Sequence, residues 1–308
     1  MQEGSRKAII AAFFANLGIA IAKFVGFALT GAASMLAEAV HSVADSTNQG
    51  LLLLGGKRAR KAATTEHPFG YGRERYFWSF VVALVIFTLG SLFALYEGVE
   101  KLRHPHELES ATVAIVILLF GIALETFSLR TAVKESQHAK GDASWWHFIR
   151  HAKVPELPVV LLEDIGAMIG LVLALVGVTT AEVTGNPRWD AVGSVGIGVL
   201  LGVIAITLVI EMKSLLIGES ASPEMTGRIR GAIEGDDAVR RVIHMRTQHL
   251  GPDELLVAAK LELGGDLDFA QVAGAINRVE NSVRATVPEA RVIYLEPGVA
   301  RAQPEGAR

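Results

Sequence analysis

The sequence predicts an α-helical membrane protein with six transmembrane helices, followed by a small α+β, ferredoxin-like cytoplasmic domain. The chain of 308 residues is 51% hydrophobic and has a mean hydropathy of +0.38, which is high for a soluble protein of this size. Its charges are uneven: residues 1–217 carry 18 Lys/Arg and 18 Asp/Glu between long uncharged runs, whereas residues 218–308, with 11 and 14, resemble ordinary soluble sequence. These observations predict a membrane domain and a soluble tail.

A membrane-spanning helix needs about 20 mostly apolar residues. Six stretches meet this requirement, and Pro68, Pro105, Pro155 and Pro187 lie in the connections between them. The spans run from about Ala8 to Leu29, Ala33 to Leu54, Tyr76 to Val99, Ala111 to Val133, Leu157 to Thr180 and Trp189 to Leu216. We therefore divide the chain into a transmembrane domain over 1–217, a cytoplasmic domain over 218–297 and a disordered tail over 298–308.

The basic residues of the loops predict the orientation of the spans. When Lys23, which lies inside the first span, is left out, 17 Lys/Arg precede residue 218, and 14 of them are cytoplasmic if the N-terminus is inside. We therefore expect both termini in the cytoplasm. The short loops and the lack of a targeting extension favour a bacterial-type inner membrane. The slightly acidic tail argues against a nucleic-acid partner.

The soluble tail has the pattern α-β-β-α-β. A Gly-Pro-Asp turn separates two strand candidates, and apolar residues at helical spacing mark the second helix. The expected elements are a helix over Pro223–Ile233, strands over Arg241–Leu250 and Glu254–Leu263, a helix over Phe269–Val287 and a strand over Arg291–Leu295.

The second span carries ionisable residues where lipid makes them costly, so each marks a functional-site hypothesis. His41 and Asp45 are four residues apart and share one helix face, where an imidazole nitrogen and a carboxylate oxygen can hold one divalent cation. Glu38, one turn earlier, is placed to orient His41 as a second-shell partner. The alternative is a structural contact, in which His41 and Asp45 pair with each other or with Lys23.

The fifth span contains two adjacent carboxylates, Glu163 and Asp164, whose side chains diverge by about 100° on a helix. Asp164 lies at nearly the same depth as Asp45, so we expect His41, Asp45 and Asp164 to meet at one midplane site. Glu125 of the fourth span sits at this depth too. It is a fourth ligand, a proton carrier or the partner of a basic residue such as Lys23.

Two segments resemble the cation diffusion facilitator (cation efflux) family. They are Ser34-x-Leu36-x-Glu38-x-x-His41-Ser42-x-x-Asp45 in the second span and His67-Pro68-Phe69-Gly70-Tyr71-Gly72-Arg73 before the third. The resemblance implies a homodimeric carrier that exchanges Zn²⁺ or a similar divalent cation for protons by alternating access. It also implies a site of His41, Asp45 and Asp164. The family's usual fourth ligand is replaced by Val160, so a water, Glu163 or Glu125 completes the site.

These observations predict a proton-coupled divalent cation exporter that is not an enzyme and needs no cofactor beyond its cargo. His41 favours Zn²⁺, with Mn²⁺, Fe²⁺, Co²⁺ and Ni²⁺ as alternatives. A metal-dependent membrane enzyme is disfavoured because common hydrolase motifs are absent, and a passive channel would move cations without proton counterflow. In the tail, Lys260, Tyr294 and Glu296 stand where the resemblance implies metal ligands, so we expect the tail to act in dimerisation.

Overall fold

The computed structural model of the chain describes residues 3–105 and 110–299. The chain forms two compact units, which we describe separately. The helical unit comprises Met1–Arg58 with Glu74–Lys213, and the sheet unit comprises Ala59–Arg73 with Ser214–Arg308. Most of the tail that the sequence predicts to be disordered lies outside the described residues.

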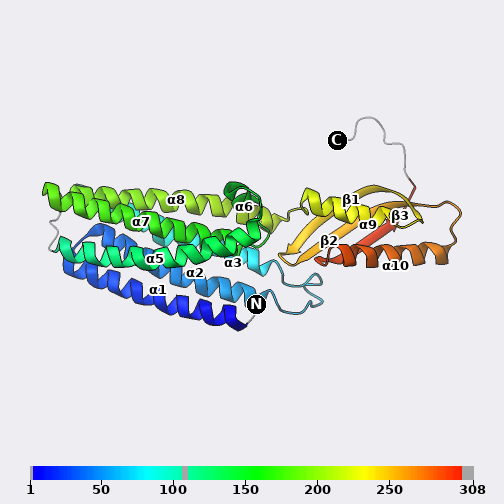
Figure 1. The fold of residues 1–308 in the computed structure, drawn as a ribbon, viewed down its shortest axis with the longest axis horizontal. Coiled ribbons are helices and arrows are strands. Elements are labelled where there is room, and N and C mark those ends of the chain that lie inside the picture. Colours follow the sequence, from blue (N-terminus) through cyan, green and yellow to red (C-terminus); the bar gives the residue numbers. More distant parts are fainter. Residues whose placement is uncertain (1–2, 106–109, 300–308) are drawn as a thin grey trace, which may run out of the picture. The chain divides into compact units, whose positions relative to one another are not determined.

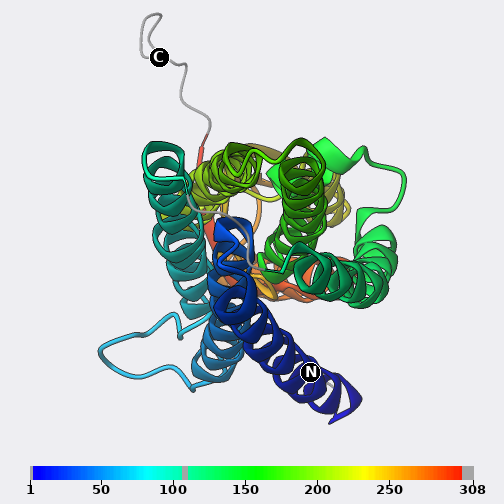
Figure 2. The same ribbon diagram turned by 90° about the vertical axis from the view of Figure 1, so that its left-hand side faces the viewer.

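The helical unit follows the predicted order of spans, and its long helices run side by side (Figures 1 and 2). Its elements are α1 (Glu3–Thr30), α2 (Ala33–Arg58), α3 (Glu74–Val85), the π-helix η1 (Ile86–Leu92), α4 (Phe93–Arg103), α5 (Ala111–Lys140), α6 (Trp145–His151), α7 (Glu156–Thr184) and α8 (Arg188–Ile217). The α3, η1 and α4 segments form one continuous span, so the helical fold class is confirmed, although the π-helical turn in the third span is not a feature the sequence predicts.

Four of these helices are long and apolar enough to cross a membrane. They are Glu74–Arg103, Ala111–Gln137, Glu156–Thr184 and Arg188–Ile217. The described apolar part of α1, Leu17–Thr30, is shorter. The remaining long helix, α2, is less apolar because its buried face carries Glu38, His41 and Asp45. Because these polar side chains are buried, α2 is the helix that carries the candidate functional site.

Small residues on α8 allow close helix packing, as their spacing predicts. A side chain at Gly193 would come within 3.1 Å of the Leu173 carbonyl oxygen on α7, and one at Gly198 within 2.8 Å of the Leu95 backbone nitrogen on α4. The backbones of α4 and α7 therefore both approach α8 closely.

The sheet unit has the predicted αββαβ order. Its elements are α9 (Pro223–Glu234), β1 (Val239–Gly251), β2 (Glu254–Leu263), α10 (Phe269–Thr286) and β3 (Ala290–Pro297). The sheet has the order β1-β2-β3, with β1 antiparallel and β3 parallel to β2. Alternate β2 residues, including Val257 and Leu261, pack against Ile233 of α9 and Val283 of α10, which places the core between sheet and helices.

The loop between α2 and α3 belongs to the sheet unit. A side chain at Gly72 would lie 2.8 Å from the carbonyl oxygen of Leu250, and one at Gly251 would lie 2.9 Å from the Cα of Gly72. Only glycine permits this approach, so the loop and the β1–β2 turn are held in backbone contact.

Candidate functional site

Polar residues follow one face of α2 along most of its length. Ser34, Glu38, His41, Asp45 and Asn48 are separated by three or four residues, which places them on one stripe of the helix. Each is buried, with at most 9% of its surface exposed. The partners of these side chains divide the stripe into three layers.

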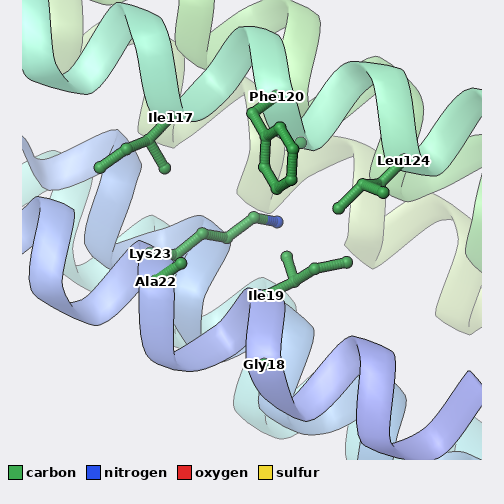
Figure 3. Close-up of a pocket in the computed structure, with 8 residues that line it drawn as sticks. Gly18, Ile19, Ala22, Lys23, Ile117, Phe120 and Leu124 are labelled. Atoms are coloured by element: carbon green, nitrogen blue, oxygen red, sulfur yellow. The ribbon is translucent and has the colours of Figure 1, made fainter.

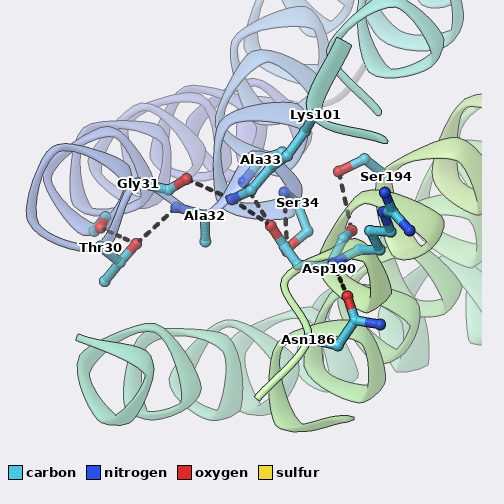
Figure 4. Close-up of polar contacts among 11 residues, drawn as sticks. Thr30, Gly31, Ala32, Ala33, Ser34, Lys101, Asn186, Asp190 and Ser194 are labelled. Carbon is cyan, nitrogen blue, oxygen red and sulfur yellow. Dashed lines mark hydrogen bonds and ion pairs between the residues drawn. The ribbon is translucent and has the colours of Figure 1, made fainter. Parts of the chain in front are cut away.

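The first layer lies at the start of α2 and contains Ser34, Asp190 of α8 and Lys101 of α4. We call it the clasp layer (Figure 4). The Asp190 carboxylate accepts hydrogen bonds from the Ala33 backbone nitrogen at 2.8 Å, from the Ser34 hydroxyl and from the Lys101 ammonium at 3.0 Å. Lys101 also donates to the carbonyl oxygen of Gly31 at 2.7 Å, at the end of α1. The clasp layer therefore joins four helix ends, and its charges balance.

The second layer contains Glu38, Ser42 and Lys23 of α1, and we call it the lysine layer. The Lys23 ammonium lies 2.9 Å from one Glu38 oxygen and donates to the Ser42 hydroxyl at 2.8 Å. The other Glu38 oxygen packs against Gly170 of α7. Glu38 thus contacts Lys23 and not His41, whose two ring nitrogens have no hydrogen-bond partner within the described chain.

The third layer contains His41, Asp45 and Asn48 together with Glu163 of α7. The His41 Nδ1 atom lies 3.5 Å from an Asp45 oxygen, and the Asn48 amide donates to Glu163 at 3.3 Å. Both His41 nitrogens and one oxygen each of Asp45, Asn48 and Glu163 are buried without a hydrogen-bond partner among the described residues. We call this group the unpaired layer.

Unpaired buried polar atoms are rare and costly in folded proteins. Among the described residues, the unpaired layer holds five such atoms, the lysine layer holds one, a Glu38 oxygen, and the clasp layer holds none. This concentration marks the unpaired layer as the place where a bound group would supply the missing contacts. The atoms present are imidazole nitrogens and carboxylate or amide oxygens, which is a donor set that suits a divalent cation.

The two carboxylates of α7 diverge, as the sequence predicts. Glu163 faces Asn48 of α2, whereas Asp164 accepts a hydrogen bond from the Ser128 hydroxyl of α5 at 3.1 Å. Glu125 of α5 lies on this second side, and the charges that act on it include those of Asp164 and Lys23.

The predicted ligands are not gathered around one point. Within the described part of the chain, no three His, Asp or Glu side chains are close enough to hold a metal ion together. His41 and Asp45 form one half of the predicted set on α2, with Glu163 facing that helix, and Asp164 belongs to the α5 side. Assembly of a full coordination shell therefore requires α7 to turn or shift relative to α2.

Sequence reasoning did not place two features in the site, although Asn48 follows the second-span segment that carries the family resemblance. Asn48 lies seven residues after His41 on the same face, a spacing that was available to identify it. The π-helix η1 lies beside His41: a side chain at Gly90 would come within 3.9 Å of the His41 Nδ1 atom. The π-helical turn has no comparable sequence signal, although such turns are frequent at functional sites.

The resemblance implies two further metal sites in this family, one in the loop before the third span and one in the tail, and in this chain internal contacts fill both positions. In the α2–α3 loop, the Thr64 and Tyr71 hydroxyls lie 3.4 Å apart, and the His67 and Tyr71 rings are 4.6 Å apart. In the sheet, the Lys260 ammonium lies 2.6 Å from a Glu296 oxygen. This ion pair occupies the positions where the family resemblance implied metal ligands.

Fold and site together define a membrane protein with buried, unpaired imidazole and carboxylate atoms between its helices. The chain belongs to the cation efflux family, whose transmembrane domain matches residues 9–217. It is 33% identical to the mitochondrial proton-coupled zinc antiporter SLC30A9 of Mus musculus over 90% of this chain and 51% of that protein. It is also 30% identical to metal tolerance protein C4 of Arabidopsis thaliana, over 85% of this chain and 58% of that protein.

A bacterial relative matches over nearly its whole length. The chain is 26% identical to the cation-efflux pump FieF of Klebsiella pneumoniae, over 94% of this chain and 91% of that protein. By contrast, the chain spans about half the length of the mouse antiporter. The names of SLC30A9 and FieF describe an antiporter and an efflux pump, and cation efflux is the class of function that the family membership supports.

Proposed function

We propose that this chain exports a divalent cation, Zn²⁺ foremost, from the cytoplasm in exchange for protons. The observation that carries the proposal is the unpaired layer, in which His41, Asp45, Asn48 and Glu163 present buried polar atoms without hydrogen-bond partners among the described residues. A bound cation would supply those contacts, and after its release protons would bind the same side chains.

The charge of the unpaired layer suits this exchange. Within the described chain, no Lys or Arg side chain forms a hydrogen bond or ion pair with Asp45 or Glu163. When both carboxylates are ionised and the imidazole is neutral, the layer carries a charge of about −2, which one divalent cation or two protons would neutralise. Because the ligands must be deprotonated to bind metal, cation binding and proton release are linked.

The donor set supports Zn²⁺ as the main cargo. Imidazole nitrogen with carboxylate oxygen suits Zn²⁺, and it also accommodates Mn²⁺, Fe²⁺, Co²⁺ and Ni²⁺. The names of the relatives SLC30A9 of mouse and human include zinc and proton coupling, which favours Zn²⁺ and antiport over the alternatives.

We propose that His41, Asp45, Glu163 and Asp164 hold the cargo in turn as the carrier changes conformation. In the state described here, Glu163 is the α7 carboxylate that faces α2, and it takes the place of the ligand that Val160 does not provide. Asp164 faces Ser128 on α5, so it joins the cargo only when α7 turns. Alternating access would consist of this rearrangement.

The remaining features of the proposal concern the whole chain. Residues 1–217 would form the transport domain in the bilayer and residues 218–297 a cytoplasmic domain that pairs two copies of the chain into a homodimer. The Lys/Arg distribution of the short loops supports cytoplasmic termini, and the shortness of these loops favours a bacterial-type inner membrane.

Transport by proteoliposomes tests the proposal. With pH 7 outside and an acidic lumen, we expect Zn²⁺ entry to be accompanied by lumenal alkalinisation, and both signals to be absent in Asp45→Asn. Zn²⁺ entry without a change in lumenal pH would indicate a passive channel. If no divalent cation enters liposomes that contain folded protein, the proposed function is wrong.

A further inference from the structure

Lys23 is an ammonium buried within a membrane helix, with open space beside it. Only 3% of the residue is exposed. A cavity of about 230 Å³ lies between α1 and α5 along its side chain, lined by Gly18 and Ile19 on one side and by Phe120 and Leu124 on the other (Figure 3). The figure shows the side chain reaching from α1 toward α5. The ammonium therefore has room to move without displacing packed atoms.

A second carboxylate lies on the α5 face that Lys23 approaches. A side chain at Gly121 would lie 3.9 Å from the Lys23 Cε atom, which places that face of α5 against the lysine. Glu125 follows one turn later on the same face. It makes no hydrogen bond or ion pair with another described residue, and Lys23 is the one cation whose charge acts on it in the described chain.

We propose that Lys23 is a tethered counter-ion that alternates between two carboxylates, Glu38 on α2 and Glu125 on α5. In the state described here it is bound to Glu38 and Ser42. The long, flexible stem of lysine allows the exchange. One buried ion pair replaces another, so the ammonium has a carboxylate counter-ion in both positions.

The exchange would couple cargo to helix position, and in this respect it rests on the proposed function. Ser42 lies on the α2 turn between Glu38 and Asp45, so the ammonium sits next to the unpaired layer when it is bound to Glu38. A divalent cation in that layer repels the ammonium and favours the Glu125 position, whereas an empty layer attracts it back. Lys23 is thus a positioning residue: its ammonium changes carboxylate partner when cargo binds, and this change alters the contact between α1 and α5.

A double-mutant cycle in full-length protein tests the proposal, with Zn²⁺ uptake per folded molecule as the readout. If Lys23 has two partners, Glu38→Gln and Glu125→Gln each leave it one partner, and each lowers uptake by about fivefold or less. In the double variant the Lys23 ammonium has neither carboxylate partner, so the loss of Zn²⁺ uptake should exceed the product of the two single losses by about tenfold or more. Single losses that multiply to give the double loss would overturn the proposal.

Two controls separate this role from a merely structural one. Glu135→Gln removes an exposed carboxylate of the same helix and should combine with Glu38→Gln without any excess loss. Adding Lys23→Met to the double variant removes the stranded charge, so it should restore the folded yield and lower the KM for Zn²⁺, while the maximal rate stays low. A double variant that does not fold supports the proposal if Lys23→Met restores folding and contradicts it otherwise.

The same assay distinguishes failure of this inference from failure of the proposed function. Wild-type protein and Asp45→Asn are measured in parallel. If wild-type protein does not move Zn²⁺, the proposed function fails. If wild-type protein transports, Asp45→Asn does not, and the Glu38 and Glu125 effects simply multiply, then only the role of Lys23 is wrong.

Discussion

The clasp layer and the unpaired layer lie on the same face of α2 and are buried to a similar degree. The polar side chains of the clasp layer are hydrogen-bonded to one another, whereas several polar atoms of the unpaired layer have no partner among the described residues. In the clasp layer, Asp190 accepts hydrogen bonds from Ala33, Ser34 and Lys101. In the unpaired layer, His41 has no hydrogen-bond partner among the described residues for either nitrogen. The difference separates a structural network, which is complete as it stands, from a site that a further ion completes.

The free energy that unpaired buried polar atoms cost supports this distinction. An unsatisfied buried polar group costs about 1–3 kcal/mol, and more when it is charged. In a helix that needed polar residues only for packing, those residues would be hydrogen-bonded, as Ser34 is to Asp190 at the second residue of α2. Four predictions test this comparison.

The largest effect is expected from Asp45→Asn. The substitution keeps the shape of the side chain but removes one of the two charges that cargo neutralises. Loss of one partner of a buried ionic contact costs about 3–5 kcal/mol, which corresponds to about 100-fold or more in Zn²⁺ affinity, and uptake should fall accordingly.

Ser46→Ala is the matched control, because Ser46 is a buried neighbour on α2 whose hydroxyl, among the described residues, bonds only to the Ser42 carbonyl at 3.0 Å. It should transport Zn²⁺ nearly as well as wild-type protein. Full transport by Asp45→Asn would remove the unpaired layer from the mechanism.

Asp190→Asn should have the converse effect and weaken the fold rather than the binding of cargo. It leaves the Lys101 ammonium buried without its counter-ion, which costs about 3–5 kcal/mol of stability. We expect a lower thermal unfolding temperature in detergent and an unchanged Zn²⁺ affinity in the molecules that fold. Adding Lys101→Met should recover part of the stability. A normal unfolding temperature with impaired binding would place the clasp layer in the site.

Glu163→Gln and Asp164→Asn form a matched pair of neighbouring charge removals on α7. Because Glu163 faces α2 here and Asp164 faces Ser128, we expect Glu163→Gln to weaken Zn²⁺ binding by about tenfold. Asp164→Asn should keep the initial binding and lose transport. Calorimetric titration and uptake, measured on the same preparations, compare them. If Asp164→Asn abolished binding while Glu163→Gln did not, the α7 orientation described here would not be the one that captures cargo.

Local spacing predicted part of the site, and contacts across helices could not be predicted. The four-residue spacing places His41 and Asp45 on one face, and the divergence of Glu163 and Asp164 follows from helix geometry alone. Which helix each carboxylate faces depends on the rotation of α7, which its sequence leaves open. For the same reason Lys23 was a candidate partner of several acids, and the structure pairs it with Glu38.

The fold was predictable for a different reason. Apolar runs of membrane length and the alternating pattern of β2 act within one segment, so they identify the six long helices and the αββαβ tail. The π-helical turn beside His41 and the backbone contact of Gly72 with Gly251 depend on neighbours far away in the sequence. Such contacts become visible only when the helices and strands are assembled.

The smallest effect is expected in the sheet unit, where ion pairs are exposed to water. Both Asp236 oxygens accept hydrogen bonds from Arg278, at 2.9 and 3.1 Å, and 61% of the arginine side chain is exposed. The Arg278 guanidinium holds the pKa of the Asp236 carboxyl below its usual range. A lowered pKa means that the carboxylate stabilises the fold at pH values above the usual aspartate pKa of about 3.9, and that this contribution is lost as the pH falls through the folded-state value.

Asp236→Asn should therefore lower the unfolding temperature of the expressed tail, residues 214–299, by only about 2 °C at pH 7, because exposed pairs contribute little. The tail is suited to this measurement because its core is drawn entirely from residues 221–293. The difference from wild-type protein should shrink below about pH 4 as the carboxyl is protonated in both states. Asp237→Asn, the same change one residue later, removes no hydrogen bond or ion pair among the described residues and should leave the unfolding temperature nearly unchanged. A difference that persisted unchanged at low pH would show that Asp236 acts through packing rather than through its charge.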